Sequence, residues 1–220
     1  MMQSPCQTKI CGLTTPHHVT TALDAGAAFV GFVTFPKSPR HILPEAAVPL
    51  ARLAKGRAQT VSVVVDPDAD MIAHIRATLA PDFIQLHGQE SPQFCAALRR
   101  DGTRIIKAFP IAAAHDLDAI APYVGFMDMI LLDAKPPQDA AMPGGHGHAF
   151  EWEILRGVDL PVPWFLSGGL RADNVAEALR VTGAKMLDVS SGVETAHGIK
   201  DSGLIAGFLT AVSVASHTDA

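Results

Sequence analysis

The sequence predicts a single-domain (βα)8 barrel, the TIM-barrel class, spanning residues 1–220. Short apolar, β-rich runs alternate with helical patterns, and one such run recurs about every 20 to 35 residues, as in the eight βα units of this class. Such barrels typically contain roughly 250 residues. A chain of 220 residues that is 48% hydrophobic and 18% charged can bury one core, so we expect one domain.

The expected strands follow one another along the whole chain. In order they are 8–11, 29–35, 60–65, 82–86, 104–109, 128–132, 163–166 and 185–189. We expect a helix after each strand, because apolar residues recur there at helical spacing: Val19, Ala22, Leu23 and Gly26; Ile72, Ile75 and Leu79; Phe94, Ala97 and Leu98; Val175, Ala178 and Leu179; Leu204, Phe208 and Val212. Ser91 and Asp173 are suited to begin helices, and Pro16, Pro44 and Pro92 fit a first helical turn.

Another α/β fold, the doubly wound sheet, has the same alternation of strands and helices. Its first βα turn normally carries a Gly-x-Gly-x-x-Gly sequence that binds a pyrophosphate. The turn here reads ICGLT at 10–14 and lacks that sequence, which favours the barrel. The long irregular segment 134–150 contains three prolines and three glycines, and we expect it to form a lid over the barrel mouth.

Composition argues against several classes of partner. The formal net charge is −5 and no run of Lys or Arg occurs, so we expect neither nucleic acid nor an anionic membrane as a partner. Apolar stretches such as 127–132 are far shorter than the roughly 20 residues of a membrane span, and the N-terminus lacks a basic segment followed by an apolar run. We expect a cytoplasmic protein, a monomer or a homodimer, that is not fused to further enzymes. Cys6, Cys11 and Cys95 are expected to be free thiols.

In a barrel of this class, the C-terminal ends of the strands carry the chemistry. They present Cys11, Arg40, Asp66, His87, Lys107 and Asp133 in turn, followed by Ser167-Gly168-Gly169 and Ser190-Ser191-Gly192. Glycines let the backbone approach an anion closely, and the loops after the seventh and eighth strands of this fold frequently bind phosphate. A lone glycine pair more often serves a tight turn, but two such loops in succession predict a phosphorylated small-molecule ligand.

Three of these residues have both a chemical and a purely structural interpretation. A thiolate at Cys11, near cationic groups, can act as a base or nucleophile, whereas most cysteines are small buried hydrophobes. Asp133 leaves an apolar strand, where desolvation favours a protonated acid, but it also fits a loop cap or an ion pair with Lys107 or Lys135. Arg40 can bind a carboxylate with two hydrogen bonds or form a surface ion pair.

His146 and His148 are spaced like a metal-binding pair. No further Cys, His or acidic ligand stands at a suitable spacing, so no metal is expected. We expect His17 and His18 to face solvent, and Cys6 and Cys95 to be unreactive.

With these motifs the chain resembles, along nearly its whole length, the phosphoribosylanthranilate isomerase family of tryptophan biosynthesis. The matching segments are KICGLT (9–14), GFVTF (31–35), SPR (38–40), QLHG (85–88), LLD (131–133), GGHG (144–147) with FEW (150–152), LSGGL (166–170) with NV (174–175), and DVSSGVE (188–194) with GIKD (198–201). The chain departs from the family at 16–19, where acidic residues are common, and at Ser167, where alanine is common.

The resemblance implies a cofactor-free Amadori rearrangement of N-(5-phosphoribosyl)anthranilate to 1-(2-carboxyphenylamino)-1-deoxyribulose 5-phosphate. It implies that Asp133 is the general acid that protonates the furanose oxygen and that Cys11 is the general base that removes the C2 proton. Arg40 would bind the anthranilate carboxylate. The other substrate-binding residues would be Gly168, Gly169, Ser190 and Ser191 at the phosphate, Asp188 nearby, and His87 at the mouth.

Two other functions stay open at this point. A phosphoribosyl isomerase of histidine biosynthesis performs the same rearrangement on a larger substrate, but that family has an aspartate at the first strand and a phosphate site in each half-barrel. Cys11, and the lack of a second glycine-rich loop after the third or fourth strand, argue against it. A non-catalytic sugar-phosphate-binding protein would keep the phosphate loops but lack an acid and a base.

Overall fold

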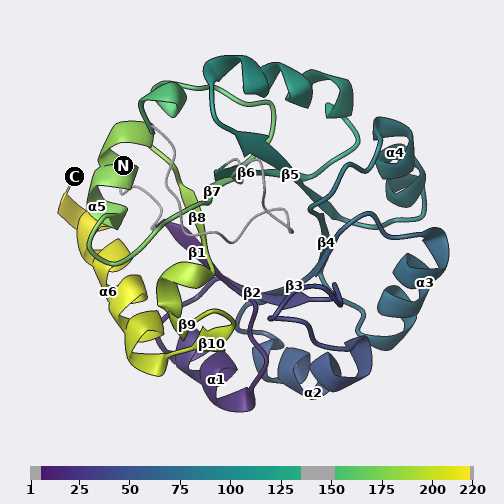
Figure 1. Ribbon diagram of the computed structural model, residues 1–220, viewed down its shortest axis with the longest axis horizontal. Coiled ribbons are helices and arrows are strands. Elements are labelled where there is room, and N and C mark those ends of the chain that lie inside the picture. Colours follow the sequence, from purple (N-terminus) through teal and green to yellow (C-terminus); the bar gives the residue numbers. More distant parts are fainter. Residues whose placement is uncertain (1–5, 135–151, 219–220) are drawn as a thin grey trace.

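The computed structural model describes residues 6–134 and 152–218. Eight parallel strands close into a barrel in which each strand pairs with the next along the chain and β1 pairs with β8, as Figure 1 shows end-on. The strands are β1 (Gln7–Cys11), β2 (Phe29–Val33), β3 (Gln59–Val64), β4 (Phe83–Leu86), β5 (Ile105–Ile111), β6 (Met129–Ala134), β7 (Trp164–Leu166) and β8 (Met186–Val189). The predicted fold class is confirmed.

Helices surround the barrel in the described part of the chain (Figure 1). The α-helices are α1 (Pro16–Asp24), α2 (Pro44–Ala54), α3 (Ala69–Thr78), α4 (Pro92–Arg100), α5 (Val175–Thr182) and α6 (Ser202–Thr218). The 3-10 helices are η1 (Ala114–Tyr123), η2 (Trp152–Leu155) and η3 (Ser191–Val193), and β9 (Glu194–Ala196) pairs antiparallel with β10 (Ile199–Lys200). After β5 the expected helix is a 3-10 helix that contains Pro122, which has no N–H to donate.

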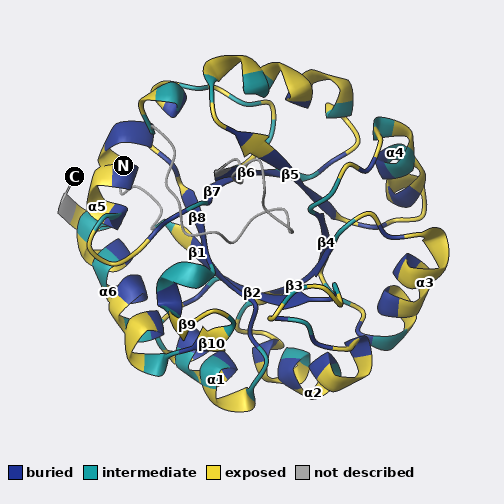
Figure 2. Ribbon diagram, in the orientation of Figure 1, coloured by how far each residue is buried: buried dark blue, intermediate teal, exposed yellow. Residues whose placement is uncertain are grey.

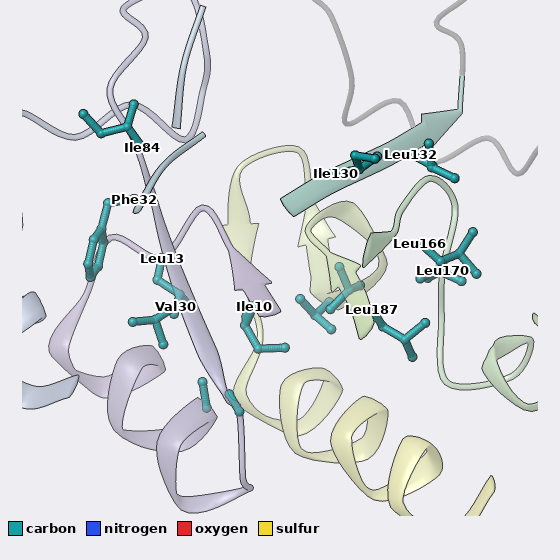
Figure 3. Packing of buried hydrophobic residues seen from close by; sticks show 14 of the residues in the cluster. Ile10, Leu13, Val30, Phe32, Ile84, Ile130, Leu132, Leu166, Leu170 and Leu187 are labelled. Atoms are coloured by element: carbon teal, nitrogen blue, oxygen red, sulfur yellow. The ribbon is translucent and has the colours of Figure 1, made fainter. Parts of the chain in front are cut away.

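Side chains alternate along each strand between two buried clusters. One lies inside the barrel and includes Cys11, Val61, Phe83, Ile106, Leu131 and Phe165. The other lies between strands and helices and includes Ile10, Val30, Leu132, Leu166 and Leu187, which Figure 3 shows from close by. Figure 2 shows the barrel strands buried and the helices exposed on their outer side. Because the period of a strand is two, Lys9 and Cys11 share the inner face of β1.

The expected helix starts are confirmed in part. Pro16, Pro44 and Pro92 stand in first turns, and the Ser91 hydroxyl accepts the Phe94 N–H at 3.2 Å. Asp173 is not the N-cap of α5. That position belongs to Asn174, whose Oδ1 accepts the Arg171 N–H at 2.8 Å.

The expected buried face of α6 is wrong at Leu204, which is exposed. Because a repeat of four residues drifts about 40° around a helix at each step, Leu204 lies about 80° from Val212 and outside the buried face, whereas Phe208 and Val212 are buried as expected. The buried residues of the helix are Ile205, Phe208, Leu209 and Val212. No helix within residues 6–134 or 152–218 is long and apolar enough to cross a membrane.

Candidate active site

One end of the barrel gathers most of the predicted site residues. Cys11 ends β1, Asp133 is the penultimate residue of β6, and Ser190 directly follows β8. Arg40 lies in the loop after β2, and Gly168 in the loop after β7. Because parallel strands of a closed barrel all end at the same mouth, these residues face a common space.

The Cys11 thiol is buried at this mouth. The residue is 6% exposed and packs in the inner cluster. Its register partner on β2 is Gly31, where an added Cβ would lie 3.1 Å from the sulfur. Burial raises the pKa of the thiol, while the positive charges of Lys9, Lys200 and Arg40 act in the opposite direction.

Asp188 lies inside the barrel in an ion pair. It is the register partner of Lys9, and Lys9 Nζ lies 2.8 Å from Asp188 Oδ1. The Ser167 hydroxyl donates to the other carboxylate oxygen, Oδ2, at 3.4 Å. Asp188 therefore stands directly below the loops that follow β7 and β8.

Asp133 faces a histidine across the barrel mouth. Its Oδ2 lies 3.3 Å from His87 Nε2, and the residue is 6% exposed. Gln85 Nε2 lies 2.8 Å from the other ring nitrogen of His87, Nδ1. With this orientation of the amide, Gln85 donates to Nδ1 and the ring proton is on Nε2, facing the carboxylate. This contact with Asp133 was not predicted from the sequence.

Lys107 does not belong to the mouth. It is the third residue of β5, and it alternates with the inward-facing Ile106 and Ala108. Its Nζ pairs with Glu90 Oε2 at 3.0 Å and donates to the Gly88 carbonyl at 2.8 Å. The expected position at a strand end is wrong because β5 continues through Pro110 to Ile111. An ion pair between Lys107 and Asp133 is likewise wrong.

Arg40 forms a buried ion pair rather than the alternative surface pair. Its Nε and Nη2 donate to the two carboxylate oxygens of Glu194 at 2.7 and 2.8 Å. Gly12 makes room for the Arg40 side chain, because a Cβ added to Gly12 would lie 2.7 Å from Arg40 Cδ. The φ of Gly12, +79°, also favours glycine at this position. Glu194 also accepts from Lys200 Nζ at 2.6 Å.

These contacts govern the charge of Glu194. Burial alone raises the pKa of its carboxyl, but the hydrogen bonds and charges of Arg40 and Lys200 outweigh that effect. They lower the pKa of Glu194 to about 2. The carboxylate is therefore ionised at any physiological pH.

The two glycine-rich loops lie against each other. Gly168 and Gly169 have φ of +92° and +65°, in the left-handed region that favours glycine. Gly192, in the second loop, packs against the carbonyl of Leu170, which leaves no room for a Cβ. Ser190 Oγ donates to the Cys11 carbonyl at 3.1 Å, and Lys200 Nζ donates to the Ser190 carbonyl at 2.8 Å. A lysine thus lies beside the predicted phosphate loop, which Ser191 continues as the first residue of η3.

A family model described as PRAI, N-(5'phosphoribosyl)anthranilate (PRA) isomerase, matches residues 8–211. The chain belongs to this family. An N-(5'-phosphoribosyl)anthranilate isomerase of Brucella canis is 51% identical over 209 residues, which cover 94% of each chain.

Solved structures of isomerases from this family have the same fold. That of Thermotoga maritima is 32% identical with a TM-score of 0.83, covering 94% of this chain and 98% of the other. A second, in complex with reduced 1-(o-carboxyphenylamino)-1-deoxyribulose 5-phosphate, is 30% identical with a TM-score of 0.79 over the same shares. The predicted family is confirmed.

The candidate site of this isomerase-family chain also contains four residues that were not predicted to belong to it. They are Lys9, Gln85, Glu194 and Lys200. Strand alternation provides a signal for two of them, because Lys9 stands two residues before Cys11 and Gln85 two residues before His87. No local pattern connects Glu194 and Lys200 with Arg40, since 154 residues separate Arg40 from Glu194.

The remaining predictions have mixed outcomes. His146, His148 and nearly all of the expected lid lie outside the described residues. His17 is exposed as expected, but His18 is half-buried, with Nδ1 3.0 Å from Thr15 Oγ1. Burial raises the pKa of Cys6 and Cys95 to about 11, which favours their unreactive thiol forms. Among residues 6–134 and 152–218, no group of three or more His, Cys, Asp or Glu is placed to hold a metal ion.

Proposed function

We propose that this chain catalyses the Amadori rearrangement of N-(5-phosphoribosyl)anthranilate to 1-(2-carboxyphenylamino)-1-deoxyribulose 5-phosphate, in tryptophan biosynthesis. The observation that carries this proposal is a buried thiol and a buried carboxyl at one barrel mouth, in a chain 51% identical to an isomerase of that name. The rearrangement needs proton transfers only, which an acid and a base can supply. We propose that it proceeds without a cofactor.

Asp133 acts first, as the general acid. It donates its proton to the furanose ring oxygen while the bond between that oxygen and C1 breaks. The lone pair of the anthranilate nitrogen forms the carbon–nitrogen double bond of a Schiff base. His87, in contact with Asp133, keeps the carboxyl directed at this position.

Cys11 acts second, as the general base. Its thiolate takes the proton from C2 of the sugar, and the electron pair of that bond forms the double bond of an enolamine. The enolamine tautomerises to the ketone of the product. One proton has left Asp133 and one has reached Cys11, and exchange with solvent restores both groups.

Binding groups hold the two anionic ends of the substrate. Glu194 binds Nε and Nη2 of Arg40, and Nη1 of Arg40 makes no hydrogen bond to any described residue. Arg40 binds the anthranilate carboxylate through this free edge of the guanidinium. The phosphate is held by Gly168, Gly169, Ser190 and Ser191, with Asp188 below them.

The proposed function also suggests an oligomeric state, a location in the cell and a binding partner for this chain. A structure of monomers of the dimeric Thermotoga maritima isomerase is known, and for this chain we propose a monomer or a homodimer in the cytoplasm. Its partner is the phosphorylated substrate, with neither nucleic acid nor membrane involved.

The test is turnover, followed by the loss of the anthranilate fluorescence of the substrate. The parent chain should convert substrate, and Cys11→Ser should lower kcat about 10²-fold or more with KM within a few-fold, because a hydroxyl is a far weaker base. Cys95→Ala, at a buried cysteine on α4, is the matched control and should retain kcat. Alkylation of Cys11 should inactivate the enzyme and be slowed by bound product.

Absence of turnover by the folded parent chain would refute the proposed reaction. Full activity in Cys11→Ser would refute the role of Cys11 alone.

A further inference from the structure

Lys9 is a buried cation to which the proposed reaction assigns no step. It is 0% exposed, and its Nζ donates to Asp188 Oδ1 at 2.8 Å inside the barrel. Burial acts to lower the pKa of this ammonium, but the Asp188 carboxylate and Cys11 together outweigh that effect, and the pKa of Lys9 is raised. Lys9 therefore keeps its positive charge at physiological pH.

This charge lies beside the Cys11 thiol. The two residues share the inner face of β1, and the geometry at Gly31 on β2 shows how near their side chains are. A Cβ added to Gly31 would lie 3.1 Å from Cys11 Sγ and 3.2 Å from Lys9 Cε. The sulfur and the end of the lysine chain thus flank one small space, which only glycine at position 31 leaves open.

Charged groups from four elements act on the thiol. They are Lys9 of β1, Asp188 of β8, Lys200 of β10 and Arg40 of the loop after β2. Arg40 and Lys200 both bind Glu194, which offsets part of their charge. After burial, which raises the pKa of the thiol, Lys9 has the largest influence and lowers it, while Asp188 opposes Lys9 more weakly.

We propose that Lys9 is a positioning residue for the catalytic base: its ammonium, held by Asp188, stabilises the Cys11 thiolate and lets a buried thiol accept the C2 proton. This inference rests on the proposed role of Cys11. It gives Asp188 a second task, because the carboxylate that lies below the phosphate loops also fixes the lysine.

The first experiment measures the thiol without the reaction. In a background with Cys6→Ser and Cys95→Ala, alkylation of Cys11 by iodoacetamide is followed by mass spectrometry across a pH series. Below the pKa of the thiol, the rate follows the thiolate fraction. Lys9→Met should slow alkylation about tenfold or more, since loss of a nearby buried positive charge raises the pKa of the thiol and lowers the thiolate fraction.

Two further variants separate charge from packing. Lys9→Arg keeps the charge and should stay within about threefold of the parent alkylation rate at each pH. Lys107→Met removes a buried lysine that faces the outer side of β5 and pairs with Glu90, and it should leave the alkylation of Cys11 unchanged. An unchanged rate in folded Lys9→Met, or an equal loss in Lys107→Met, would overturn the proposal.

The second readout is the pH profile of kcat. In Lys9→Met the acid-side limb should move to higher pH by the same shift that alkylation reports, so that raising the pH recovers turnover. A purely structural role would lower kcat equally at every pH and would overturn the proposal. If alkylation shifts while the kcat limb stays in place, Lys9 still tunes the thiol and it is the assignment of Cys11 as base that fails.

A double variant covers the case in which Lys9→Met does not fold, because a lone Asp188 charge would be left buried. Lys9→Met with Asp188→Asn removes both charges at nearly constant volume. Slower alkylation than in Asp188→Asn alone supports the proposal, because those two proteins differ only in the Lys9 charge. Alkylation as fast as in Asp188→Asn, or faster, contradicts it.

Discussion

Two aspartates at opposite ends of β6 differ in every contact that they make. Asp128, just before the strand, accepts the Ile105 N–H at 2.7 Å and pairs with Arg99 at 2.7 Å. Asp133, near the other end, faces His87 at the barrel mouth. In barrels of this class the C-terminal face carries catalysis and the opposite face contributes stability. We therefore propose different tasks for the two aspartates, a structural one for Asp128 just before the strand and a catalytic one for Asp133 near its C-terminal end.

Asp133→Asn should fold and bind product, yet lose 10²-fold or more in kcat, because an amide of the same shape has no proton to donate to the ring oxygen. Asp128→Asn is the matched control. It should keep kcat and lower the free energy of unfolding by about 1 kcal/mol, through a weakened hydrogen bond to Ile105. The measurements are steady-state turnover and urea unfolding. An Asp133→Asn variant that retains more than a tenth of kcat would rule out the general-acid role.

At the scale of elements, the β9–β10 hairpin organises one side of the mouth. Its turn, at Gly198, has a φ of +84° and packs against Pro39, next to Arg40. Glu194 and Lys200 stand at its two ends, and Lys200 reaches from there to Ser190. The hairpin thus connects the predicted carboxylate site with the predicted phosphate loop through side chains that are almost fully buried.

The depressed pKa of Glu194 predicts a pH-dependent contribution to stability. A carboxyl whose pKa falls on folding from 4.5 to about 2 stabilises the folded state fully above pH 4.5 and loses this effect as the pH falls toward 2. Glu194→Gln should therefore be less stable than the parent at neutral pH by roughly 2 kcal/mol after allowance for solvent screening, and the difference should shrink across that acid window.

Glu153→Gln is the control for this prediction. Glu153 also makes two hydrogen bonds to an arginine, Arg156, but the pair is exposed to solvent on η2. Its removal should change stability little at any pH. Urea unfolding of the three proteins between neutral pH and pH 3 measures both effects, and a Glu194→Gln difference that is constant with pH would contradict the assignment.

For the whole molecule, barrel closure leaves no free strand edge among β1 to β8, since β1 pairs with both β2 and β8. We therefore predict that residues 1–220 unfold as one domain. Fluorescence of Trp152 and Trp164 reports on η2 and β7, whereas far-UV circular dichroism reports on all elements. The two urea transitions should coincide, and separate midpoints would indicate more than one folding unit.

Several elements were predictable because their signals are local. All eight strands were expected near their observed positions, since each is a short apolar run between turn-forming residues. Errors arose where context overrides local preference. The run at 104–109 continues as β5 through a proline, and Leu204, predicted to share the buried face of its helix with Phe208 and Val212, is exposed while Ile205 is buried.

The sequence by itself determined the fold class, the family, and the strand ends that carry Cys11 and Asp133, because these depend on periodicity and on motifs a few residues long. Only the tertiary structure decided the charge partners: Lys9 with Asp188, Arg40 with Glu194 and Lys200, and Asp133 with His87. Lys9 and Asp188 are 179 residues apart and meet only when β1 and β8 close the barrel. Burial at that closure removes water from the pair, and the nearby Asp188 carboxylate acts to keep Lys9 charged.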